Sequence, residues 1–126
     1  MSCVGGIDQV VEIRPVGNQM KYELTEFRVK SGEVIKLVMI NTATASVMKH
    51  NVMILKPGSD VNAIGELAIM AEGNIPTSED IVAYTAVAEP QSQTEVTFTA
   101  PAPGRYPYIC TYPGHYLLMK GVMIVE

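Results

Sequence analysis

The residues of this chain best suited to chemistry lie between Cys110 and Met119, in the run Cys-Thr-Tyr-Pro-Gly-His-Tyr-Leu-Leu-Met. Cys110, His115 and Met119 offer a thiolate, an imidazole and a thioether, and Pro113 and Gly114 favour a tight turn between them. Soft sulfur ligands combined with imidazole favour copper. The spacing Cys-x4-His-x3-Met therefore predicts a loop that binds a metal ion.

One further imidazole would complete a trigonal His2Cys site with a weak axial Met, which is the ligand set of blue-copper electron-transfer centres. The chain has two histidines, and the second is His50. It precedes the apolar run 51–55, which predicts a buried strand and places His50 at the mouth of that strand. The sequence thus predicts copper as the metal and His50, Cys110, His115 and Met119 as its ligands.

Each of these residues also has an ordinary structural explanation. A Met in an apolar segment commonly fills a core, a free Cys is commonly a small buried hydrophobe, and a lone His is commonly a hydrogen-bonded structural residue. A disulfide between Cys3 and Cys110 in a metal-free binding sandwich is the corresponding alternative. Only the joint spacing of the three loop residues, Cys110, His115 and Met119, favours the metal.

Two other functions compete with electron transfer. A copper oxidase or nitrite reductase needs further histidines, and both histidines of this chain are already assigned, so we expect no enzyme and no catalytic residues. A copper storage or delivery protein is the remaining alternative. Such proteins use clusters of exchangeable Met or Cys, whereas among the eight methionines only Met119 has ligand spacing.

Length and charge narrow the class of protein. A chain of 126 residues predicts a single domain over residues 1–126, large enough to bury a core without disulfides. Its net charge of −4 and the absence of a basic run argue against a nucleic-acid partner. No stretch of 18 apolar residues exists, so we predict no membrane span.

The apolar pattern predicts an all-β fold. Short runs bounded by turn residues predict about eight strands, at residues 10–14, 20–30, 34–40, 48–55, 80–87, 94–99, 105–110 and 120–126. From Ser59 the apolar period changes to that of a helix that ends before Gly73. Its apolar residues share one face: Val61, Ile64, Leu67, Ala68 and Ala71. We therefore expect a single Greek-key β-sandwich with one short inserted helix.

Residues 110–121, CTYPGHYLLMKG, resemble the ligand loop of the azurins and auracyanins, small blue-copper proteins of the cupredoxin family. The similarity extends outward: residues 102–110 resemble the auracyanin approach to the cysteine, residues 83–86 have an auracyanin-like sequence, and residues 17–20 resemble the early azurin sequence. His50-Asn51 matches the His-Asn pair of the family. The resemblance covers nearly the whole chain, and it implies a cupredoxin-like sandwich that transfers single electrons by cycling Cu(II) and Cu(I).

The resemblance also implies roles around the ligands. Asn51 matches the family residue whose side chain ties the first histidine segment to the loop near Thr111. Lys49 stands where azurins have a glycine whose carbonyl approaches the metal, so a fifth contact from this carbonyl is not predicted. The spacing from His115 to Met119 follows azurin, whereas auracyanins have one more residue there.

Partner recognition is expected at the same loop. Pro113, Tyr116 and Leu117 flank His115 and predict a small apolar patch for partner docking, with burial of Tyr116 and Leu117 as the alternative. Lys49 and Lys120 would steer an acidic partner to this end. We expect a monomer that exchanges electrons with redox proteins such as c-type cytochromes or a terminal oxidase or reductase.

Location is inferred from the resemblance alone. Family members are exported, which implies a periplasmic or other extracytoplasmic protein in which Met1 replaces a removed leader. No signal peptide is visible in front of Cys3. Because bacterial lipoproteins are acylated on an N-terminal cysteine, Cys3 is interpreted as a relic or as a lost lipid anchor.

Overall fold

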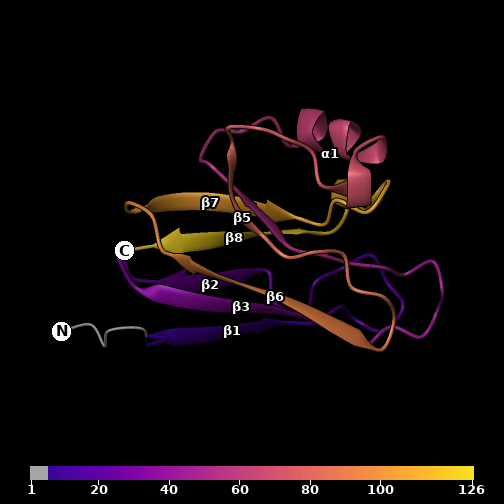
Figure 1. Ribbon diagram of the computed structural model, residues 1–126, viewed down its shortest axis with the longest axis horizontal. Coiled ribbons are helices and arrows are strands. Elements are labelled where there is room, and N and C mark those ends of the chain that lie inside the picture. The colour runs from indigo at the N-terminus through magenta and orange to yellow at the C-terminus, as the bar shows by residue number, and fades with distance from the viewer. Residues whose placement is uncertain (1–5) are drawn as a thin grey trace.

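The apolar runs form strands in two facing sheets in the computed structural model, which describes residues 6–126 (Figure 1). The first sheet has the strand order β1-β3-β6, and the second has the order β2-β8-β7-β4-β5. Strand β1 is parallel to β3 and β2 is parallel to β8, whereas the other pairs are antiparallel. The predicted all-β sandwich is confirmed. The strands are β1 (Gln9–Ile13), β2 (Glu26–Val29), β3 (Val34–Asn41), β4 (Met53–Leu55), β5 (Ile81–Tyr84), β6 (Ser92–Thr99), β7 (Gly104–Ile109) and β8 (Lys120–Val125).

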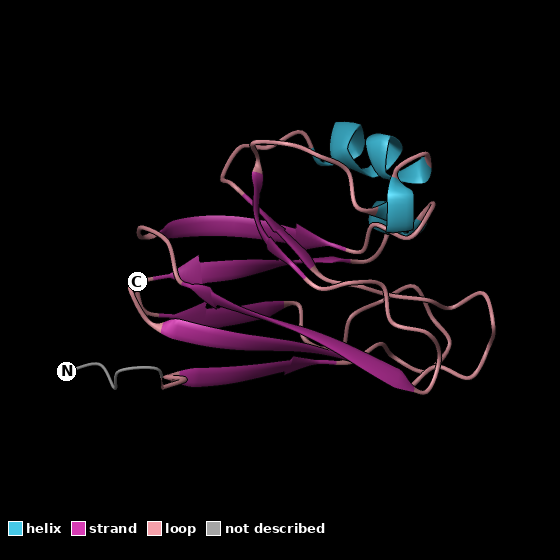
Figure 2. Ribbon diagram, in the orientation of Figure 1, coloured by secondary structure: helices cyan, strands magenta, loops and turns pink. Residues whose placement is uncertain are grey.

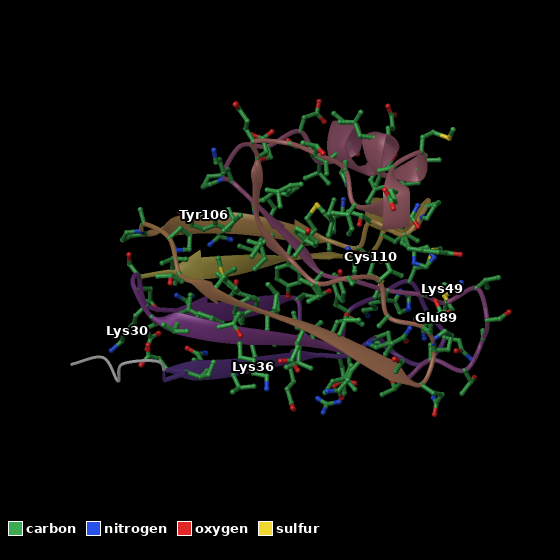
Figure 3. All side chains as sticks on the ribbon, in the orientation of Figure 1. Lys30, Lys36, Lys49, Glu89, Tyr106 and Cys110 are labelled. Carbon is green, nitrogen blue, oxygen red and sulfur yellow. The ribbon has the colours of Figure 1, made fainter. Side chains whose placement is uncertain are left out.

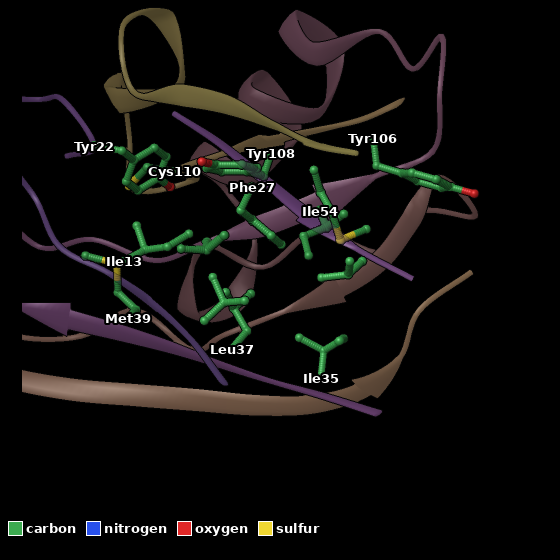
Figure 4. Packing of buried hydrophobic residues seen from close by; sticks show 14 of the residues in the cluster. Ile13, Tyr22, Phe27, Ile35, Leu37, Met39, Ile54, Tyr106, Tyr108 and Cys110 are labelled. Atoms are coloured by element: carbon green, nitrogen blue, oxygen red, sulfur yellow. The ribbon is translucent and has the colours of Figure 1, made fainter. Parts of the chain in front are cut away.

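The space between the sheets is filled by side chains from both inner faces (Figure 4). Alternation along the central strand β3 turns Ile35, Leu37 and Met39 inward, and all three are fully buried. Burial of an aliphatic side chain of this size stabilises a fold by roughly 1.5–3 kcal/mol. The sandwich therefore has a core that does not depend on a bound metal.

The inserted helix α1 (Val61–Ile69) lies outside the five-stranded sheet (Figures 1 and 2). Asp60 caps its first turn by accepting a hydrogen bond from the amide of Ala63. On the predicted apolar face Ile64 and Ala68 are buried, whereas Leu67 at the edge of that face is 56% exposed. The helix rests on the sandwich through Ile64, which packs in an apolar cluster with Met53 and Ile109, and through Gly65, which lies against the ring of Tyr116.

Three strands are shorter than the sequence predicts, and one of them is β5, which covers only part of the predicted run 80–87. The run 20–30 forms a ladder only over β2, and Tyr22 pairs with Pro15 in an isolated bridge. The run 48–55 forms a ladder only over β4, and His50 pairs with Ala88 in another isolated bridge. In the runs 20–30 and 48–55, the residues outside the ladder include Tyr22 and Asn51, whose side chains make hydrogen bonds to distant parts of the chain.

The loop with the predicted ligands lies at one end of the sandwich. Cys110 directly follows β7, and the short 3-10 helix η2 (His115–Leu117) leads to β8. Cys110 and Lys49 lie at one end of the molecule, and Tyr106 and Lys30 lie toward the other (Figure 3). Within residues 6–126 no helix has the length and apolar character needed to cross a membrane. The predictions made for Cys3 fall outside the described residues.

Candidate metal centre

His50 is fixed by backbone hydrogen bonds on the side of the centre away from the loop. Its amide donates to the carbonyl of Ala88 at 3.2 Å, and its carbonyl accepts from the amide of Ala88 at 2.8 Å. This pair extends the sheet by one bridge beyond β4 and β5. These two hydrogen bonds therefore fix the backbone from which the His50 imidazole projects.

The loop from Cys110 to Met119 closes on itself. The Cys110 amide donates to the Met119 carbonyl at 3.1 Å, and the Met119 amide donates to the His115 carbonyl at 2.8 Å. Gly114 adopts a left-handed conformation with φ of 82°, which favours glycine, immediately before His115. The turn predicted from Pro113 and Gly114 thus brings the two ends of the loop together.

Three donor atoms meet at this end of the sandwich. The Nδ1 atoms of His50 and His115 are 3.3 Å apart, and the Sγ atom of Cys110 lies 3.9 Å from the first and 3.7 Å from the second. A point equidistant from three atoms at these separations lies about 2.1 Å from each, inside the range of roughly 2.0–2.3 Å for metal bonds to nitrogen and sulfur. The group can therefore bind one metal ion.

The protonation states of the two histidines suit metal binding. Burial, together with the neighbouring His115, lowers the pKa of His50 to about 4, and burial also lowers the pKa of His115. Both rings are therefore neutral at pH 7 and have a free lone pair. Burial raises the pKa of the Cys110 thiol to about 11, while backbone amides of Asn51 and Tyr112 act in the opposite direction. A metal ion is needed to deprotonate this thiol at neutral pH.

An ordinary structural role explains His50 and Cys110 less well than metal binding does. His50 is fully buried, its Nε2 has no hydrogen-bond partner among the described residues, and its Nδ1 faces only the other members of the group. A buried structural histidine would normally satisfy both ring nitrogens. Cys110 is a free buried thiol. The donor chemistry of two imidazoles and one thiolate suits copper.

Met119, the fourth predicted ligand, is fully buried, and its carbonyl accepts a hydrogen bond from the Cys110 amide, so it lies at the same end of the core as Cys110. The carbonyl of Lys49 also faces the group and lies 4.0 Å from the Sγ atom of Cys110. The Lys49 ammonium points away and pairs with Glu89 at 3.4 Å (Figure 3). A side chain at position 49 is therefore compatible with a carbonyl turned toward the site.

Asn51 joins the two segments that present the donors. Its Nδ2 donates to the Oγ1 atom of Thr111 at 2.8 Å, and its Oδ1 accepts from the Thr111 amide at 2.7 Å. Each partner directly follows a predicted ligand, His50 and Cys110. Both residues are buried, so the two bonds are made without competition from water.

Two residues of this network were not predicted. Tyr22 donates its hydroxyl hydrogen to the Asn51 carbonyl. Thr85 accepts from the Val52 amide through Oγ1, and its backbone carbonyl accepts from the Asn51 Nδ2 at 3.5 Å. The sequence gives little signal for either residue. Tyr22 occurs in an apolar alternation that predicts only core packing, and Thr85 stands out only through the resemblance of residues 83–86 to auracyanins.

The residues predicted for partner docking do not all reach the surface. Pro113 is exposed, and Leu117 is 58% exposed. Tyr116 is 8% exposed because its ring packs against Gly65 of α1, so the prediction that Tyr116 forms part of a surface patch is wrong. Leu118, which was not predicted, is 65% exposed.

Comparison with known proteins identifies the family. Residues 9–126 match the profile of the copper binding proteins, plastocyanin/azurin family. The chain is 35% identical to auracyanin-A of Chloroflexus aurantiacus over 121 residues, which cover 92% of this chain and 74% of that protein. It is 33% identical to auracyanin-B of the same organism, covering 93% of this chain and about half, 52%, of that protein.

A solved structure agrees with these matches. The dithionite-reduced auracyanin of Roseiflexus castenholzii superposes with a TM-score of 0.86 at 40% identity, covering 96% of this chain and 99% of that one. The group of His50, Cys110 and His115 lies within the matched region. The chain therefore belongs to the plastocyanin/azurin family of copper-binding proteins and is a cupredoxin of the azurin/auracyanin type.

Proposed function

We propose that this protein is a one-electron carrier whose copper ion is bound by His50, Cys110, His115 and Met119. The proposal rests on one observation: the two Nδ1 atoms and the Cys110 Sγ atom lie close enough together to bind one ion, in a buried site of a chain that belongs to a copper-binding family. Copper, when bound, supplies the Cu(II)/Cu(I) couple. The proposal treats residues 1–126 as one cupredoxin domain without catalytic residues.

In this proposal the chain keeps its donor atoms in one arrangement for both oxidation states. His50 is held by the bridge to Ala88, and Cys110 is held by the bond from its amide to Met119. Both segments are tied together through Asn51 and Thr111. Because little of the site can move, little nuclear rearrangement accompanies a change of charge, and electron transfer is fast. Outer hydrogen bonds of this kind commonly orient metal ligands.

The thiolate of Cys110 would have two sources of stabilisation in the protein. Backbone amides of Asn51 and Tyr112 lower the pKa of the thiol against the effect of burial. Hydrogen bonds to a sulfur ligand reduce the charge that it gives to the metal, and so they affect the redox couple. Met119, buried beside Cys110, is assigned as the weak axial ligand.

The surface near the loop is proposed as the place where redox partners dock. A groove of about 540 Å³ lies beside the loop and has Met20, Met48 and Leu118 among its apolar residues. Lys21 and Lys120 also line it, and both are exposed. An apolar groove with two ammonium groups suits a brief encounter with an acidic redox protein, such as a c-type cytochrome or a terminal oxidase or reductase.

The family also suggests an oligomeric state and a cellular location for the protein. We assign it as a monomer in the periplasm or another extracytoplasmic space, in line with its family. The alternative of copper storage or delivery is not favoured. A storage site must exchange its metal readily, whereas the three donors found here are each at most 5% exposed.

The experiment that tests this function is a redox cycle of the copper-loaded protein. We expect ascorbate to bleach the visible thiolate-to-copper absorption and an oxidant to restore it repeatedly, with one electron exchanged per chain. Cys110→Ser should stay folded and colourless, since the core is complete without a metal. Several coppers per chain that a chelator removes easily would favour storage instead.

A further inference from the structure

Tyr22 is a core residue with a specific bond to the metal-binding segment. It is 1% exposed, and its hydroxyl donates to the backbone carbonyl of Asn51. It belongs to a hairpin held by the amides of Val16 and Glu23, which donate to the carbonyls of Lys21 and Arg14. A third part of the chain, remote from both ligand segments in sequence, therefore reaches the metal centre.

The Asn51 carbonyl depends on this contact. Asn51 is fully buried and lies outside any strand, so no sheet ladder supplies a donor to its carbonyl. The Tyr22 hydroxyl is the donor that the described residues offer to it. A buried carbonyl without a donor carries a desolvation penalty, and the peptide that contains it tends to rotate to find another partner.

Rotation of this peptide would move the centre. The carbonyl belongs to the same residue whose side chain makes both bonds to Thr111, and Asn51 follows His50 directly. Thr111 in turn follows Cys110. We propose that Tyr22 is a positioning residue of the metal centre, because its hydroxyl fixes the Asn51 carbonyl and thereby holds the His50 and Cys110 segments together.

A neighbouring residue provides a matched control. Tyr108 packs against Tyr22 with ring centroids 5.3 Å apart, is fully buried, and also donates its hydroxyl to a backbone carbonyl (Figure 4). Its acceptor is Leu24, which is no part of the network around Asn51. Tyr22→Phe and Tyr108→Phe therefore delete the same atom from the same cluster, and only the first deletion removes a bond to the metal-binding segment.

The first test uses metal-free protein and does not depend on the proposed function. Hydrogen exchange of the Thr111 amide, which donates to Asn51, is measured by NMR relative to the Leu37 amide in β3 as an internal reference. We expect Tyr22→Phe to speed exchange at Thr111 about tenfold relative to Leu37. Tyr108→Phe should change both amides by the same factor.

Two outcomes would overturn the inference in this test. One is an unchanged ratio of Thr111 to Leu37 exchange in Tyr22→Phe. The other is a Tyr22→Phe protein that does not fold while Tyr108→Phe does, which would make the hydroxyl a requirement of the whole core and not a support for one segment.

The second test rests on the proposed function and uses the Cu(II)-loaded variants. We expect Tyr22→Phe to shift the copper hyperfine splitting in the EPR spectrum and to change the intensity ratio of the thiolate-to-copper bands. Tyr108→Phe should reproduce the wild-type spectra. Identical spectra for wild type and Tyr22→Phe would contradict the inference, whereas a wild-type protein without these bands would contradict the proposed function.

Discussion

Asn51 and Thr111 form a reciprocal pair across the metal centre, since the Asn51 amide group donates to the Thr111 hydroxyl and accepts from the Thr111 backbone amide. The residues are 60 positions apart in sequence, and each directly follows a residue that presents a donor atom. This pair therefore holds the His50 and Cys110 segments in a fixed position relative to each other. Its removal should therefore affect both stability and the metal centre.

We predict that Thr111→Val lowers the free energy of unfolding of the metal-free protein by about 1–2 kcal/mol. The substitution keeps the shape and the backbone amide but removes the Oγ1 acceptor, so the buried Asn51 Nδ2 keeps only the 3.5 Å contact with the Thr85 carbonyl. Urea unfolding measures the change. Thr97→Val, the same replacement at an exposed position of β6, should change stability by less than about 0.5 kcal/mol, and equal losses would refute the assignment.

We predict that the metal-free protein loses stability as the pH falls from about 6.5 to about 4. The folded-state pKa of His50 is lowered to about 4, and that of His115 is lowered as well, so the folded protein does not take up the protons that the unfolded chain binds below its ordinary histidine pKa. The stabilisation that comes from these two lowered pKa values is fully present above about pH 6.5 and is lost progressively as the pH falls below it. Urea midpoints measured across this range give the slope.

A variant with His50→Gln and His115→Gln is the control for this pH dependence. It keeps the carboxylates of the protein and removes both imidazoles, so its stability should fall less steeply between pH 6.5 and pH 4. Parallel pH profiles for the variant and the wild type would show that other groups cause the loss.

We predict that Gly65→Ala destabilises the protein by roughly 1–3 kcal/mol, although alanine is the better helix former by about 1 kcal/mol. A Cβ atom at position 65 would overlap the ring of Tyr116, which packs on the helix backbone there. Thermal or urea unfolding measures the loss. Adding Tyr116→Ala should make the Gly65→Ala substitution neutral or favourable, and simple addition of the two losses would argue against this contact.

The fold was largely predictable because its signals are local. Alternation and turn residues predicted the ladders of β1, β3, β6, β7 and β8 closely, and the change of apolar period after Ser59 predicted the start of α1. The errors occur where tertiary contacts decide the outcome. Residues 20–25 and 48–52 have strand-like sequence but bond to remote partners, and Leu67 has helical phase but no element above it to cover it.

The candidate centre was predictable for a different reason. His50 and His115 are the two histidines of the chain, and Cys110, His115 and Met119 come from one short loop, so few combinations exist. The support around them was harder to foresee. The bond from Tyr22 to Asn51 joins residues 29 positions apart and uses a backbone acceptor, which leaves no signature in a single sequence. Burial of Tyr116 likewise depends on a bare helix backbone at Gly65.

We predict that Leu118→Glu slows electron self-exchange of the copper-loaded protein at least about tenfold. Self-exchange requires two molecules to meet near their metal centres, and Leu118 is 65% exposed at the groove beside the loop. A carboxylate there would replace an apolar contact between the two molecules by a charged group that must lose water on docking. NMR line broadening in mixtures of the two oxidation states gives the rate.

Val10→Glu is the matched control for the docking surface. Val10 is 54% exposed on β1, which belongs to the three-stranded sheet, whereas the loop joins β7 and β8 of the five-stranded sheet. The same charge is therefore added away from the loop. It should leave self-exchange within about twofold of wild type, since charges separated by more than a Debye length are largely screened. Equal slowing by both variants would show that net charge, and not the groove, controls the encounter.

The most direct test of the account is a crystal structure of the copper-loaded protein with anomalous data collected at the copper edge. We predict one copper ion per chain, bonded at roughly 2.0–2.3 Å to the Nδ1 atoms of His50 and His115 and to the Sγ atom of Cys110, with Met119 on the axis. Copper bound away from Cys110, or bound through Nε2 of His50, would contradict it.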